Sequence, residues 1–261
     1  MRLVSVALIA VLLSACGESG SAETEPPGLI SNPGQGALEA QCGPLRMPIG
    51  ELSENSISVP LPEEPPNSAA ARALGDFRQD AAPEADIFDD YTWTVANETG
   101  DEIALLGRGI VGGGDDRIGY GYAYADRIGD EWRIQRFGTC RLRVTAEGYG
   151  SAIWALAARP DPSQSTIALV VNELDCANGE GPIDRDVVPV ILSDAQQVAI
   201  VILVEPVSGN ANCLSNPWHP VVVDVGSPVG SRQLLDAGTV PARLQEWPPS
   251  QQYLDTFGQS G

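Results

Sequence analysis

Short apolar runs separated by turn residues make up most of the chain after residue 90. Apolar and polar positions alternate in several of these runs, which is typical of half-buried strands bounded by Gly, Pro, Asn and Asp. Residues 198–204 are apolar on both faces, which predicts a central strand. Strands are predicted over residues 93–95, 103–106, 118–125, 131–137, 152–157, 166–172, 187–192, 198–204 and 221–225.

One short amphipathic helix is predicted before the first of these strands. Asn67 and Ser68 are suitable capping residues, and Ala70, Leu74 and Phe77 share one face of a helix that reaches about residue 78. No long helix separates the later runs, so antiparallel connections are expected there. The expected fold is mainly β: a small α+β N-terminal module followed by an antiparallel β-sandwich-like C-terminal module.

The strands over residues 118–125 and 131–137 are predicted to form a hairpin with its turn near residues 129–130. Period-two spacing places three tyrosines of the first strand on one face, where a tryptophan of the second strand is a cross-strand neighbour. An exposed aromatic strip of this kind binds a glycan or a peptide, whereas a buried strip packs against a helix or the second module; packing is favoured. The strip consists of Tyr120, Tyr122, Tyr124 and Trp132.

The first residues predict export and a lipid anchor. Arg2 precedes an apolar run over residues 3–13 that is too short to span a bilayer, as in a signal peptide. The run ends in Leu13-Ser14-Ala15-Cys16, which resembles a bacterial lipobox. In such signals the Cys16 thiol is acylated and becomes the new N-terminus, which places the protein on the outer face of the cytoplasmic membrane. The alternative is an ordinary secretory signal, and it also predicts export.

Composition divides the chain into five segments. Residues 1–15 are the expected signal peptide, and residues 16–40, rich in Gly, Ser, Glu and Pro, are expected to be a disordered tether. Residues 41–145 form the expected α+β module and residues 146–240 the β-sandwich-like module. Residues 241–261 are the expected C-terminal tail.

The charge of the chain excludes nucleic acid as a partner. Fifteen basic residues stand against 35 acidic ones, and the net charge is −20. Such a surface repels phosphate backbones and anionic headgroups. The expected attachment to the membrane is therefore through the lipid on Cys16, and the remaining partner expected is a protein or glycan of the cell surface.

Cysteine content predicts two disulfides. Without Cys16 four cysteines remain, an even number that suits an exported chain and allows three pairings. We favour Cys42–Cys140 and Cys176–Cys213, because each pair lies within one expected module. A disulfide at Cys213 would remove the nearest thiolate from the single histidine, His219.

Catalytic motifs and metal-binding motifs are absent from the sequence, and no cofactor, metal or catalytic residue is predicted. His219 has no Gly-x-Ser-x-Gly elbow or HExxH partner, so packing at the surface or in a loop is expected. Glu173 and Asp175 flank the end of a predicted strand, with Arg185 or Arg232 as expected ion-pair partners. A structural role is favoured for this cluster.

Several motifs in the C-terminal half resemble uncharacterised secreted lipoproteins of actinobacterial type. The resemblance covers about residues 130–240 and implies export and cystine-stapled modules, but no activity. It rests on Phe137-Gly138-Thr139-Cys140, Glu173-Leu174-Asp175-Cys176-Ala177-Asn178-Gly179, Cys213-Leu214-Ser215-Asn216-Pro217 and residues 228–238, PVGSRQLLDAG.

The function expected is that of a membrane-anchored envelope lipoprotein that binds or assembles with another component and catalyses no reaction. A solute-binding lipoprotein of a transporter is an alternative, but its two α/β lobes need more helix than the pattern predicts. A hydrolase of cell-wall polymer or polysaccharide that uses two carboxylates is a second alternative, because the 35 acidic residues offer many pairs.

Overall fold

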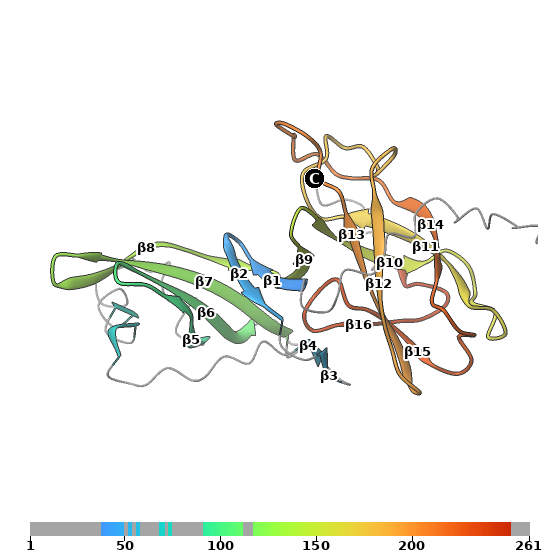
Figure 1. The fold of residues 1–261 in the computed structure, drawn as a ribbon, viewed down its shortest axis with the longest axis horizontal. Helices are drawn as coiled ribbons and strands as arrows, with labels where there is room; N and C mark the ends of the chain where they lie inside the picture. Colours follow the sequence, from blue (N-terminus) through green and yellow to red (C-terminus); the bar gives the residue numbers. More distant parts are fainter. Residues whose placement is uncertain are drawn as a thin grey trace, which may run out of the picture.

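The computed structural model describes residues 38–49, 52–53, 56–57, 68–70, 73–74, 91–111 and 117–251. The fold is mainly β with predominantly antiparallel sheets, as the sequence predicts. A four-stranded sheet, a three-stranded sheet and a seven-stranded sheet follow one another along the molecule (Figure 1). The expected signal peptide, most of the tether and Cys16 lie outside the described residues.

The four-stranded sheet is an antiparallel meander that contains the predicted hairpin. Every strand predicted between residues 93 and 137 is present, and each is longer than the pattern indicated. A two-residue turn at Gly129 and Asp130 joins the last two strands, and Gly129 has the positive φ that such turns require. The strands are β5 (Tyr91–Glu98), β6 (Glu102–Val111), β7 (Arg117–Ile128) and β8 (Glu131–Cys140).

The tyrosines of β7 pack into the core, as favoured from the sequence. Tyr120 and Tyr124 are buried, and Tyr122 is partly buried against the same cluster. Burial raises the pKa of the Tyr120 and Tyr124 hydroxyls. The exposed Arg136 of β8 covers the Tyr124 ring, with its guanidinium 4.4 Å from the ring centroid. The same guanidinium forms an ion pair with Glu102.

Trp132 does not belong to this aromatic strip, which corrects the prediction. The pairing of β7 with β8 shifts by one residue between Tyr124 and Ala125, so Tyr124 faces Arg136 while Ala125 faces Ile134. One inserted residue in one strand reverses the face of everything beyond it. Trp132 therefore packs on the opposite face, against the cluster that contains Ile103 and Leu105.

The three-stranded sheet joins the two larger sheets. Its strands are β1 (Leu38–Cys42), β2 (Leu45–Pro48) and β9 (Arg143–Ala146), in the order β2-β1-β9. Alternate residues of β1 and β2 are buried in a core that also receives side chains from β6, β7, β12 and β13. Two expected boundaries are corrected: the tether does not extend to residue 40, because β1 begins at Leu38, and β9 crosses the boundary at residue 145.

The seven-stranded sheet has the strand order β14-β11-β10-β13-β15-β16, and β12 also pairs with β13. Every strand predicted between residues 152 and 225 is present. The single parallel pair among the described strands is β13–β15. The strands are β10 (Gly150–Leu156), β11 (Thr166–Glu173), β12 (Val187–Ser193), β13 (Gln197–Val204), β14 (His219–Asp224), β15 (Gln233–Asp236) and β16 (Arg243–Gln245).

Strand β13 is central, as its apolar sequence predicts. It pairs with β12 along residues 198–204, and its other edge is shared between β10 and β15. At the point where β10 leaves β13, the Trp154 indole donates to the Ile200 carbonyl at 2.9 Å. The buried Asp236 carboxylate accepts from the backbone N–H groups of Trp154 and Gly238. These bonds satisfy backbone groups that the sheet ladder leaves unpaired.

Segments expected to be helix or tail are described only in part. Residues 69–70 and 73–74 are helical, while the rest of the predicted helix lies outside the described residues. Strand β16 falls within the expected C-terminal tail and pairs with β15, because Gln245 and neighbouring residues extend the sheet. The short strands β3 (Leu52–Ser53) and β4 (Ser56–Ile57) pair with each other. Among the described residues no helix is long and apolar enough to cross a membrane.

Candidate functional site

The two disulfides have the pairing that the sequence favoured. Cys42 bonds to Cys140, which joins the end of β1 to the end of β8, and Cys176 bonds to Cys213. Cys42 is buried and Cys213 is exposed. Because Cys213 is oxidised, it is neither a thiolate nucleophile nor a metal ligand beside His219.

A pocket of about 420 Å³ lies between the two disulfides. One wall comes from the β1–β2 turn and from the link between β8 and β9; the other comes from the end of β11 and the loop before β14. The two expected modules therefore meet at this pocket, and pockets at such junctions are common ligand sites. Its lining includes Arg141, Arg143, Asp175, Leu214 and Asn216.

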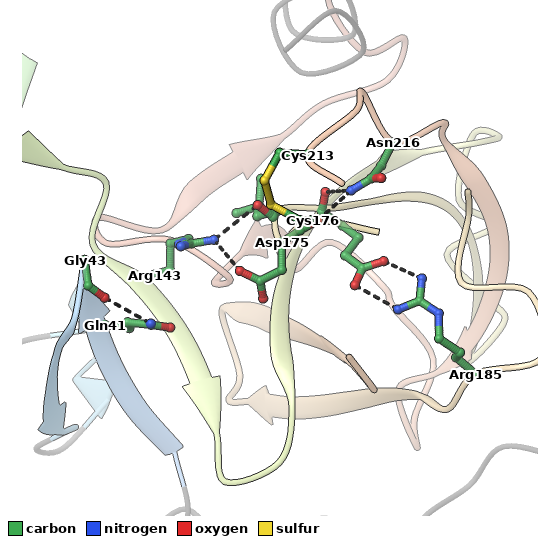
Figure 2. Close-up of polar contacts among 10 residues, drawn as sticks. Gln41, Gly43, Arg143, Asp175, Cys176, Arg185, Cys213 and Asn216 are labelled. Atoms are coloured by element: carbon green, nitrogen blue, oxygen red, sulfur yellow. Dashed lines mark hydrogen bonds and ion pairs between the residues drawn. A yellow bond between two sulfur atoms is a disulfide. The ribbon is translucent and has the colours of Figure 1, made fainter. Parts of the chain in front are cut away.

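The chain segment that follows β11 is held from two sides, as Figure 2 shows. From β9, Arg143 Nη1 donates to the Leu174 carbonyl at 3.3 Å and to Asp175 Oδ1 at 2.9 Å. From the loop before β14, Asn216 Nδ2 donates to the carbonyls of Glu173 and Asp175 at 3.0 and 2.7 Å. These bonds fix the backbone beside Cys176, so the polar wall of the pocket is preformed.

Glu173 forms the best-buried ion pair among the described residues, and its partner is Arg185. The Arg185 guanidinium donates to both Glu173 carboxylate oxygens, and the Glu173 side chain is only 1% exposed. Arg185 also donates to the Glu205 carbonyl at 2.7 Å. The hydrogen bonds to Glu173 raise the pKa of Arg185 above its already high ordinary value. The pair anchors the strand end that carries Asp175 and Cys176.

Several polar atoms of the lining have no partner among the described residues. Arg143 uses only Nη1 in its hydrogen bonds, which leaves Nη2 and Nε, and its side chain is 23% exposed. The Asp175 side chain is 35% exposed, and only its Oδ1 accepts the guanidinium. The Asn216 Oδ1 atom is buried and accepts no hydrogen bond from the described residues. Unsatisfied buried polar atoms are uncommon, so this wall has unused capacity for hydrogen bonding.

Glycines allow the elements around the pocket to approach one another. A Cβ on Gly43, which has φ +57°, would overlap the Tyr122 ring at 2.5 Å, so the β1–β2 turn rests directly on that ring. A Cβ on Gly150 would overlap Asp175 Oδ2. Gly150 thus leaves room for the second oxygen of the carboxylate beside the pocket.

The residues singled out from the sequence come together only in part. Glu173 pairs with Arg185, as expected, but the expected role of Arg232 is wrong: Arg232 binds carbonyls of residues 227–229 instead. His219 begins β14 opposite Val171, at a strand end and not in a loop, and it does not line the pocket. Within the described ranges no group of three His, Cys, Asp or Glu side chains is placed to hold a metal ion.

Sequence reasoning missed Arg143, the residue of β9 that binds the segment after β11 at the pocket. Arg143 and Asp175 are 32 residues apart, and no local pattern links them. One signal was available in the distribution of charge. Residues 127–143 contain five of the fifteen arginines and only two acidic residues, in a chain of net charge −20.

Comparisons with known proteins find no significant match among family models, curated proteins or solved structures.

Proposed function

We propose that the protein is an exported, lipid-anchored protein of the cell envelope that binds a small polar ligand in the pocket between its two disulfides. The observation that carries the proposal is the preformed polar wall of that pocket, in which Arg143 and Asn216 hold the segment around Asp175. A site whose groups are already fixed loses little conformational entropy when a ligand binds.

Two independent observations support the proposed location of the protein outside the cytoplasm. The sequence over residues 1–16 has the layout of a lipoprotein signal, and disulfides of this kind persist in oxidising compartments outside the cytoplasm. Acyl chains on Cys16 would hold the protein at the membrane, since each buried methylene contributes about 0.8 kcal/mol. The acidic surface then keeps the folded part away from anionic headgroups.

Replacement of Cys16 by alanine tests the anchor. We expect the unaltered chain to incorporate a labelled fatty acid and to remain with the membrane fraction of the producing cells. We expect Cys16→Ala to incorporate no label, because the acceptor thiol is absent. Fractionation followed by gel fluorography measures both properties, with Cys16→Ser as a second variant. Equal labelling of the wild-type and variant chains would contradict the proposed anchor.

A further inference from the structure

The unused hydrogen-bonding atoms of the pocket include both donors and acceptors, and together they indicate which ligand would fit. Arg143 offers donors at Nη2 and Nε, which form part of a fork that matches a carboxylate. Asp175 offers the remaining acceptor capacity of its carboxylate, because the side chain is 35% exposed and accepts only one hydrogen bond from Arg143, at Oδ1. A complementary ligand carries an anionic group next to an N–H or O–H donor.

The local charge favours an anionic group at Arg143 even though the whole chain is acidic. Arg141 and Arg143 both line the pocket, and they end the arginine-rich stretch of residues 127–143. The nearby Glu173 carboxylate is already neutralised by Arg185. Positive side chains in a recess concentrate an anion there.

A carboxylate fits better than a phosphate. Arg143 is already paired with Asp175, whose charge lies beside any anion bound to the same guanidinium. A phosphate monoester dianion would meet more repulsion from Asp175 than a singly charged carboxylate, and its phosphoryl oxygens carry no proton to donate to Asp175 at neutral pH. A carboxylate with a neighbouring N–H or O–H satisfies Arg143 and Asp175 together.

We propose that the pocket binds a carboxylate that has an N–H or O–H donor one or two atoms away, with the carboxylate on Arg143 and the donor on Asp175. The carboxyl end of a peptide and a sugar acid both have this chemistry. The inference rests on the proposed binding function and adds the class of ligand. A volume of about 420 Å³ suits a ligand of this size.

Isothermal titration of the full lipid-anchored chain in mild detergent tests the ligand class. The probes are N-acetyl-alanyl-alanine, its C-terminal amide, glucuronate and glucose. We expect the free-carboxylate peptide or glucuronate to bind, and the matching neutral compound to bind at least about tenfold more weakly, because a hydrogen bond to a charged group is lost. Binding of the peptide alone identifies a peptide end, and binding of glucuronate alone identifies a sugar acid.

Two substitutions separate binding from a merely structural role. Arg143→Lys keeps the charge and one donor for Asp175 but loses the fork, so binding should weaken about tenfold; Arg133→Lys, in an exposed pair with Glu131, is the control. Asp175→Asn still accepts from Arg143 but loses the charged acceptor. It should weaken N-acetyl-alanyl-alanine and strengthen propionate, which has a carboxylate and no donor. A purely structural role would move both ligands in the same direction.

A further titration uses a low-molecular-weight extract of the producing cells' envelope. It separates a failure of the proposed ligand class from a failure of the proposed binding function. Heat of binding from the extract with none from the carboxylates overturns the ligand class and leaves the binding function standing. No heat from any sample overturns both. Equal binding of the free carboxylates and the neutral compounds also overturns the ligand class.

Discussion

Among the charged residues around the pocket, Arg185→Ala should be the most destabilising single substitution. We expect it to lower the free energy of unfolding by about 3–5 kcal/mol. The Glu173 carboxylate is 1% exposed and receives both of its charge-assisted hydrogen bonds from Arg185. Without the guanidinium, the carboxylate remains buried and uncompensated. Urea denaturation followed by circular dichroism gives the free energy directly.

Two further variants test the cause of this loss. Arg133→Ala removes an exposed pair with Glu131 and should cost under about 1 kcal/mol. Adding Glu173→Gln to Arg185→Ala should restore part of the stability, because the buried charge is gone. A loss for Arg185→Ala no greater than that of Arg133→Ala would show that the buried pair contributes little.

Removal of the Cys42–Cys140 disulfide, as Cys42→Ser with Cys140→Ser, should lower the free energy of unfolding by about 4–5 kcal/mol on the chain-entropy model. The disulfide joins β1 to β8 and spans 98 residues, so its loss increases the conformational entropy of the denatured chain more than loss of the other disulfide does. The Cys176–Cys213 disulfide spans 37 residues, and its loss should cost about 3–4 kcal/mol. Denaturant unfolding of the two double variants measures the difference.

The order of the two losses is the informative result. A larger loss for the shorter loop would show that native contacts around Cys176, such as those of Asn216, determine the effect rather than the entropy of the denatured chain. Intact mass without reductant verifies that the remaining disulfide has formed in each variant.

The sequence predicted the strands well where local pattern decides them. The alternation in residues 118–125 and the apolar run of residues 198–204 are properties of neighbouring residues, so β7 and β13 follow from them. The disulfide pairing also followed, because each pair of cysteines lies within one compositional module. Strand β1 was missed because its few residues follow a polar segment and are buried only through contacts with distant strands.

The face of Trp132 and the partner of Asp175 depend on contacts that a single sequence does not encode locally. One bulge beside Tyr124 moves Trp132 to the opposite face, and nothing in the hairpin sequence marks where the bulge falls. Arg143 reaches Asp175 because β9 leads into β10, and the pairing of β10 with β11 places Asp175 beside Gly150. The Glu173–Arg185 pair was within reach of sequence reasoning, since both residues flank the same predicted turn region.

The central claim is that the pocket between the disulfides holds the ligand, and thermal unfolding tests it most directly. Wild type, Leu214→Trp and Leu244→Trp are melted with and without envelope extract. Leu214 lines the pocket and is 58% exposed, so the larger tryptophan side chain should obstruct part of the pocket; Leu244 is 50% exposed and does not line it. Binding to the native state raises the melting temperature by mass action. We expect the extract to raise the melting temperature less for Leu214→Trp than for wild type and Leu244→Trp. An equal rise in all three proteins, or no rise in any, would contradict the claim.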